Sequence, residues 1–161
     1  MIGEKSSLTA YYSLVVTGRT LYLPASDILY LAGKEEVLDI EHIPCIRFNG
    51  ELYPVYGFRE GFIPQPGLQG GDSRAALICS PESGTEPALA LSCRAIYKLR
   101  ANHRPRRLPD FMVGSSPIEG VLRHNTGWEC YTSAHQLIDY FEKALRYELP
   151  QFQFQNVRLV S

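Results

Sequence analysis

Apolar and polar residues alternate with a period of two, or apolar residues form short runs between turn residues, along most of the chain before residue 62. Both patterns are typical of β-strands, whose successive side chains point to opposite faces of a sheet. The chain therefore opens with a predicted hairpin, with strands at residues 11–16 and 20–23, a turn at Gly18 and Arg19, and an end at Pro24.

The segment after this hairpin has two interpretations. Residues 25–31 fit either a short helix capped by Ser26 or a third strand that continues to Val37, because the run is too short for periodicity to decide. The next pattern is more specific. Strands at 43–48 and 51–56 flank Asn49-Gly50, a dipeptide that favours the positive φ angles of a type I′ turn.

Short strand patterns continue after residue 73. Five strands are predicted, at residues 74–79, 87–91, 95–99, 118–123 and 128–132. The turn before the last of them contains Gly127, which we expect in a left-handed conformation.

The period changes near residue 134. Apolar residues then recur at steps of three and four, which predicts an amphipathic helix over 134–147 with a buried face of Leu137, Ile138, Phe141 and Leu145. Ser133 and Gln136 fit a capping box at its start, and Pro150 ends it. The tail, residues 148–161, alternates again from Phe152 and predicts an edge strand.

A segment rich in proline and glycine, IPQPGLQGGDS at residues 63–73, separates two groups of strands and is predicted to be a linker. It also separates charges: residues 1–72 hold 5 basic and 9 acidic side chains, and residues 73–161 hold 11 and 8. The two parts, net −4 and +3, are expected to meet different partners. We therefore predict an all-β fold of two small antiparallel barrels or curled sheets, with subdomains at about 8–62 and 73–147.

Composition and motifs argue against several classes of function. The whole chain has a net charge of −1, so bulk charge indicates no partner, and no apolar run approaches a membrane span or a secretory signal. The default compartment is the cytoplasm. Cys45, Cys79, Cys93 and Cys130 are too widely spaced for a zinc or disulfide framework and read as buried, reduced residues. The sequence also lacks the common catalytic and phosphate-binding motifs, so we expect no enzyme, no metal site and no cofactor.

One segment is strongly basic. RANHRPRR, at residues 100–107, includes Arg104, Arg106 and Arg107, and Pro105 is expected to keep it out of regular structure. It reads as a solvated loop, as a contact for an acidic protein surface, or as a nucleic-acid contact, although no aromatic residue interleaves the cations. Trp128 fits either an interface or the core.

Two stretches resemble the CheW-like chemotaxis adaptor family. RFNGELYPVYGFR, at residues 47–59, is similar to the family pattern N-L-R-G-x-V-x-P-V-x-D-L-R, and Ile118-Glu119-Gly120 is similar to its later Ile-x-Gly strand, which precedes a turn, a last strand and a helix. The likeness spans roughly residues 8–141 in order.

This resemblance implies two SH3-like five-stranded β-barrels within a single CheW-like domain, followed by a late amphipathic helix. It also implies a non-enzymatic adaptor that couples chemoreceptor cytoplasmic tips to the regulatory domain of a histidine kinase. The partner-binding residues that we expect are Arg47, Phe48, Asn49, Arg59, Arg104, Arg106 and Arg107. A nucleic-acid-binding β-barrel that uses residues 100–107 is the alternative, and membrane insertion is not expected.

The chain departs from the family pattern at two positions. The family arginine before the turn glycine is Asn49 here, with Arg47 two residues earlier in the place of the usual asparagine. The aspartate that follows the Pro-Val pair is Gly57. Losing a charged contact at an interface costs about 1 to 3 kcal/mol, which is enough to change partners. We therefore interpret the chain as a divergent paralogue that serves a secondary chemosensory or surface-motility system.

Overall fold

The computed structural model describes residues 9–148 except 84, 102–103, 114–115 and 125–126, with only the backbone described at 101 and 146–148. The predicted tail strand and the helix end at Pro150 lie outside the described residues. The strands are β1 Thr9–Val16, β2 Arg19–Pro24, β3 Ile28–Gly33, β4 Leu38–Ile40, β5 Ile43–Phe48, β6 Glu51–Arg59, β7 Ile63–Pro66, β8 Arg74–Cys79, β9 Pro87–Cys93, β10 Ala95–Ala101, β11 Arg106–Arg107, β12 Gly120–His124 and β13 Gly127–Tyr131. The helices are α1 Asp110–Val113 and α2 Ala134–Glu148, with 3-10 turns η2 Ala25–Asp27 and η3 Lys34–Glu36.

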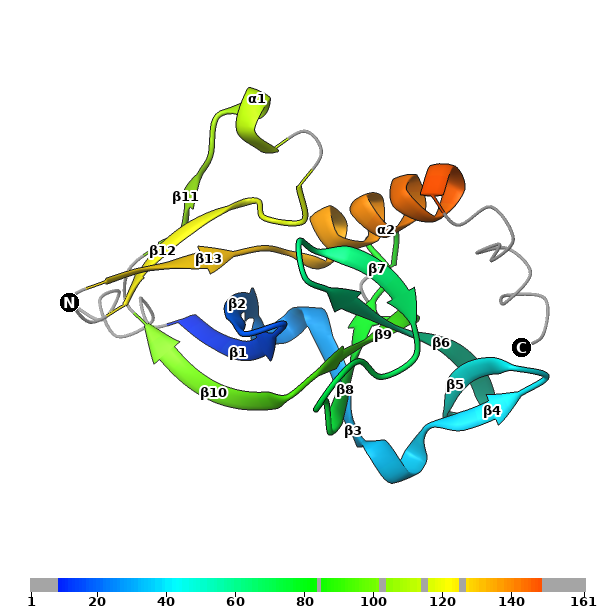
Figure 1. Cartoon of the computed structure of the whole chain (residues 1–161). Helices are drawn as coiled ribbons and strands as arrows, with labels where there is room; N and C mark the ends of the chain where they lie inside the picture. The colour runs from blue at the N-terminus through cyan, green and yellow to red at the C-terminus, as the bar shows by residue number, and fades with distance from the viewer. Residues whose placement is uncertain (1–8, 84, 102–103, 114–115, 125–126, 149–161) are drawn as a thin grey trace.

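The strands form two sheets (Figure 1). The first has the order β10-β1-β2-β13-β12-β11, and the second has the order β3-β8-β9-β6-β5-β4, with β7 paired to β6. Within each sheet five strands are longer, and β4, β7 and β11 are short additions at the edges. The prediction of an all-β fold with two curled sheets and a late helix is therefore confirmed. The sheets are not purely antiparallel as predicted, because β2 and β13 pair in parallel, as do β6 and β9.

The strands do not pair according to the sequential subdomains predicted at 8–62 and 73–147. β1 and β2 leave the first group and lie between β10 and β13, and β8 and β9 join β3 and β6. A period of two marks a segment as a strand but does not say which strand it meets, because every strand presents the same backbone donors and acceptors. Each sheet therefore contains strands from both halves of the sequence.

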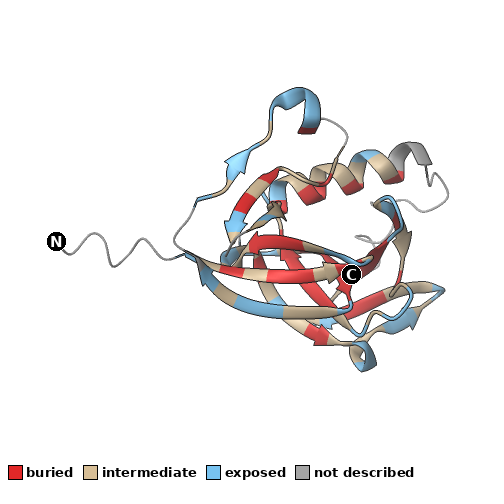
Figure 2. Cartoon of the chain, turned by 60° about the vertical axis from the view of Figure 1, so that its left-hand side comes forward, coloured by how far each residue is buried: buried red, intermediate tan, exposed pale blue. Residues whose placement is uncertain are grey.

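Each sheet curls around a small core, and the two sheets share a larger one (Figure 2). The shared core includes Leu14 and Leu21 from the first sheet, Phe58 and Leu91 from the second, and Phe141 from α2. The rings of Phe58 and Phe141 stack with centroids 4.9 Å apart. Burial of this kind stabilises the fold by about 25 cal/mol per Å² of apolar surface, so the helix fixes one sheet against the other.

Part of the predicted linker is a strand. β7, which contains Pro64 and Pro66, pairs with the end of β6. The N–H of Gly67 donates to the carbonyl of Val55 at 2.7 Å, so alternation turns the nitrogens of both prolines away from β6. Proline is tolerated in β7 because no strand of the described chain pairs with its other side.

Helix α2 begins where the sequence predicts it, and all four residues of the predicted apolar face are buried. Only half of the predicted capping box is present. Ser133 Oγ accepts the N–H of Gln136 at 3.3 Å, but the Gln136 side-chain amide donates to the carbonyl of Ser116. The carboxylate of Asp27 provides the second cap, accepting the N–H of Ala134. Each cap satisfies a backbone donor that the first turn of a helix leaves unpaired.

Smaller differences concern turns. The turn of the first hairpin is Thr17-Gly18, both with positive φ, so Arg19 belongs to β2. Residues 25–31 follow neither interpretation alone, because η2 leads directly into β3. Gly127 starts β13 and is not among the residues with positive φ, so the left-handed prediction there is wrong.

Candidate functional site

The tip of the β5–β6 hairpin is an exposed surface that carries three of the predicted residues. Asn49 and Gly50 have φ angles of 52° and 82°, and Phe48 pairs with Glu51, as expected for a type I′ turn. Arg47 and Asn49 are exposed. Phe48 is half-buried because its ring packs 5.5 Å from that of Tyr30 on β3. The aromatic pair therefore supports the tip, and Arg47 and Asn49 present it to solvent.

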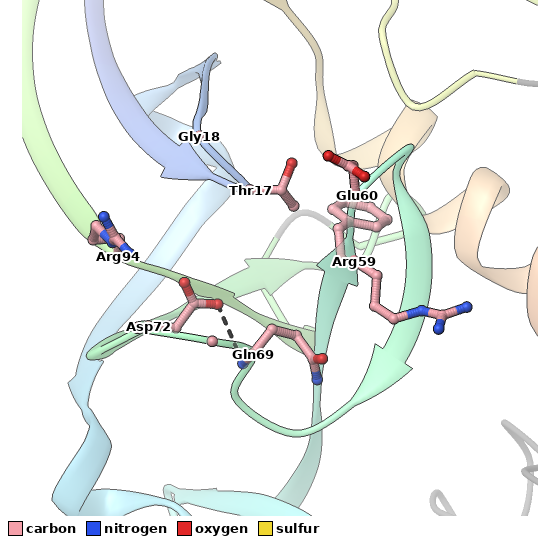
Figure 3. Close-up of a pocket in the computed structure, with 10 residues that line it drawn as sticks. Thr17, Gly18, Arg59, Glu60, Gln69, Asp72 and Arg94 are labelled. Carbon is pink, nitrogen blue, oxygen red and sulfur yellow. Dashed lines mark hydrogen bonds between the residues drawn. The ribbon is translucent and has the colours of Figure 1, made fainter.

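The opposite end of β6 borders a cleft of about 370 Å³ between the two sheets (Figure 3). Four segments line it: the β1–β2 turn, the end of β6, the loop before β8, and the residue between β9 and β10. Arg59 stands at the end of β6 and is exposed, so the structure places this predicted residue on the rim of the cleft. Arg94, which the sequence analysis did not single out, is a second cation of the lining.

Hydrogen bonds fix the loop of this cleft. Asp72 Oδ2 accepts the hydroxyl of Ser92 at 2.5 Å and the N–H of Gln69 at 3.3 Å. The Gln69 amide donates to the carbonyls of Pro66 and Gly67 at 3.0 and 3.1 Å. These bonds hold the loop that lines one wall of the cleft.

The same network explains why residue 57 is glycine. A Cβ on Gly57 would meet the hydroxyl of Ser92 and would lie 2.5 Å from Cγ of Gln69, so no side chain fits. A carboxylate nevertheless lies close by, since Asp72 binds that same Ser92 hydroxyl. Asp72 therefore places a carboxylate beside the Ser92 hydroxyl that Gly57 faces.

The thiol beneath this network is not a nucleophile. Cys93 is fully buried, and burial, together with the charge of Asp72, raises its pKa to about 12. A thiol with such a pKa stays protonated at neutral pH, whereas nucleophilic cysteines have lowered pKa values.

The structure divides the three predicted arginines of the basic segment. Arg107 pairs with Asp110 at 3.5 Å and with Glu119 at 3.8 Å. Arg104 and Arg106 instead line a pocket of about 260 Å³ with Arg123 and Trp128. Pro105 does not exclude regular structure, since Arg106–Arg107 forms β11 against β12.

The sequence analysis did not identify Arg123 as a member of this group, and it did not decide whether Trp128 lies at an interface or in the core. Trp128 is 52 % exposed, which favours the interface interpretation over the core. Arg123 and Trp128 are directly opposite each other on β12 and β13. The predicted hairpin contained both strands, but only the register brings these two side chains together.

Gly120 makes the approach of β11 possible. A Cβ on Gly120 would collide with the backbone carbonyl of Arg106, so only glycine allows β11 to lie this close to β12. The glycine of the Ile118-Glu119-Gly120 motif therefore has a physical role in placing Arg106.

A further exposed surface was not predicted. α1 projects beyond the first sheet (Figures 1 and 2), with Phe111 88 % and Met112 50 % exposed.

Within the described part of the chain, no three His, Cys, Asp or Glu side chains are placed to hold a metal ion. No helix in that part is long and apolar enough to cross a bilayer.

Comparisons with known proteins identify the fold. No family model matches the chain, and no curated protein matches its sequence. Among solved structures, the scaffolding protein TtCheW from Thermoanaerobacter tengcongensis is similar, with a TM-score of 0.55 and 13 % sequence identity. The match covers 76 % of this chain and 87 % of that one. The chain therefore has a CheW-like fold, in agreement with the resemblance found in the sequence.

Proposed function

We propose that this protein is a non-enzymatic adaptor that couples the cytoplasmic tips of chemoreceptors to the regulatory domain of a histidine kinase. The CheW-like fold supports this proposal, as do the ordered motifs that led to the resemblance. The protein acts in the cytoplasm, and its departures at Asn49 and Gly57 suit a secondary chemosensory or surface-motility system.

One observation carries the proposal: β6 bears an exposed surface at each end. The hairpin tip with Arg47 and Asn49 precedes this strand, and the cleft with Arg59 follows it. Asn49 and Arg59 are ten positions apart, so an extended strand of about 3.3 Å per residue holds the two surfaces roughly 30 Å apart. Two partners can therefore bind at once without competing, which an adaptor requires.

Charge divides the molecule more sharply by sheet than by sequence. The segment 25–93, which forms the second sheet, holds 4 basic and 10 acidic residues, net −6. Residues 9–24 and 94–148, which form the first sheet and α2, hold 10 basic and 6 acidic residues, net +4. Opposite fields select different partners and orient their approach, which supports two distinct binding surfaces.

The test uses the purified full chain with a receptor tip fragment and a kinase regulatory domain from the same organism. Calorimetric titration with each partner, alone and then in the presence of the other, is expected to give two independent affinities. The double variant Arg47→Ala/Asn49→Ala is expected to weaken one partner at least tenfold, and Arg59→Ala to weaken the other.

Lys143→Ala serves as the control, because it removes an exposed cation on α2 that pairs with Asp139 on its own helix. It is expected to change neither affinity. Binding to neither partner rejects the proposed function. If the Arg47→Ala/Asn49→Ala variant and the Arg59→Ala variant both weaken binding of the same partner, the two-surface arrangement is rejected.

A further inference from the structure

Arg104, Arg106 and Arg123 form a cluster of positive charge that the described part of the protein leaves uncompensated. Arg107, their neighbour in sequence, has two carboxylate partners, but no described carboxylate forms an ion pair with any of the three. Glu129 follows Trp128 in the chain, yet it pairs with the buried Leu122 and so lies on the other face of β13. Like charges held together repel one another, so this cluster favours an external anion.

The backbone holds this cluster in a defined arrangement. Arg106 is opposite Val121, and Arg123 is two residues further along β12, so both side chains share one face with Trp128. The guanidinium carbon of each arginine lies 5.8 Å from the centroid of the Trp128 ring. Stacking on an aromatic ring restrains a guanidinium group while its N–H donors stay available at the edge.

We propose that this cluster, Arg104, Arg106, Arg123 and Trp128, binds a carboxylate-rich segment of a partner protein. Planar guanidinium groups bind carboxylates through two parallel hydrogen bonds, and a pocket of about 260 Å³ accommodates one or two acidic side chains. This surface lies on the first sheet, away from both ends of β6, so the inference does not depend on the proposed function.

The observations favour an acidic protein segment over single-stranded nucleic acid. Nucleic-acid grooves offer several aromatic platforms along a basic track, each worth about 1 to 3 kcal/mol per stacked base. Here one ring lines the pocket, and two guanidinium groups already lie over it.

The chain contains a single tryptophan, so its fluorescence reports directly on this site. The experiment titrates the full chain with a capped hexaglutamate peptide, and separately with a heptathymidylate that carries six phosphates. Hexaglutamate is expected to shift the emission and to saturate, with an affinity that falls as salt is added. Arg106→Ala/Arg123→Ala is expected to weaken binding at least tenfold, with circular dichroism showing that the variant is folded.

Two control variants separate this cluster from general electrostatics. Lys34→Ala removes one exposed charge from the 3-10 turn η3, which follows β3 of the second sheet, and Arg107→Ala removes the arginine whose charge is already paired. Each is expected to change the hexaglutamate affinity by less than twofold. Tighter binding of heptathymidylate than of hexaglutamate at equal salt overturns the proposal in favour of nucleic acid. An affinity unchanged in the double variant, or no binding of either probe, also overturns it.

Discussion

The carboxylate of Asp27 accepts a hydrogen bond of 2.8 Å from the backbone N–H of Ala134, 107 positions later in the chain. It thereby joins the turn between β2 and β3 to the first residue of α2. The contact ties together the two sheets and the helix that covers their shared core, and it adds a negative charge where the helix dipole favours one.

Asp27→Ala is expected to lower the free energy of unfolding by about 1 kcal/mol, because the N–H of Ala134 loses its acceptor. Asp27→Asn keeps an acceptor oxygen and is expected to lose less. Urea denaturation at pH 7 measures both, with Ser26→Ala as a control at an exposed neighbour. Equal stability of the wild type and the alanine variant would contradict the capping role.

The stability contributed by Asp27 depends on pH in a definite direction. Burial raises the pKa of this carboxyl above its ordinary 3.8, the nearby charge of Glu119 adds to the rise, and the hydrogen bond from Ala134 opposes it. The folded state therefore holds the proton more tightly than the unfolded chain. The part of the stability that depends on protonation of Asp27 is fully present below about pH 3.8 and is lost as the pH rises through the folded pKa, whereas the ionised carboxylate still accepts the N–H of Ala134 at pH 7. The difference in stability between wild type and Asp27→Asn is expected to vary over that interval and to level off above it.

Gly57→Ala is expected to destabilise the protein by about 1 to 3 kcal/mol, because the added Cβ overpacks the space held by Ser92 and Gln69. The sign of the stability change is informative. Replacing a strand glycine without a clash usually stabilises a protein, because alanine restricts the unfolded chain. Thermal denaturation gives the comparison. A matched change, Gly71→Ala, meets only the flexible end of the Arg94 side chain and is expected to cost less.

Asn49→Arg introduces the arginine of the CheW-like sequence pattern at a position whose φ is 52°. Arginine lacks the tolerance of asparagine for the left-handed region, so the variant is expected to lose about 1 kcal/mol of stability. If the turn arginine sets partner choice, the same variant binds a conventional receptor or kinase partner more tightly despite that loss. Denaturation and calorimetry on one sample separate the two effects, and an unchanged partner affinity would argue against this role of residue 49.

The four cysteines are expected to differ in reactivity. Burial raises the pKa of Cys45 and Cys79 and raises that of Cys93 to about 12, and all three side chains are buried. Cys130 is partly exposed. A thiol-specific chromogenic reagent at pH 7.5 is thus expected to modify one thiol rapidly in the folded protein and four in denaturant. Cys130→Ser should abolish the rapid phase, and its persistence would show that another thiol is accessible.

Local features could be predicted from the sequence where their cause is local. The type I′ turn follows from Asn49-Gly50, because these two residues tolerate the backbone angles that the turn needs. The buried face of α2 follows from the spacing of Leu137 and Phe141, because helical geometry alone places them on one side. Buried, unpaired cysteines were likewise predicted, and the structure confirms burial for three of the four.

Features that depend on a neighbour distant in sequence could not be predicted. The sequence contains the prolines of β7, but only the pairing shows that their nitrogens face away from β6. It contains Asp27, but nothing near that residue indicates that it caps α2. The sequence presents the basic segment as one unit. In the structure Arg107 pairs with carboxylates, whereas Arg104 and Arg106 line a pocket with Trp128.

The sequence by itself determined most of the longer strands, the tight hairpin and the amphipathic helix, since each depends on side-chain alternation or on the backbone preference of a few adjacent residues. Only the tertiary structure decided how the strands interlace, which charges remain uncompensated, and why residues 57 and 120 are glycine. The physical reason is that pairing, burial and close backbone approach depend on segments far apart in the chain, which a local pattern does not identify.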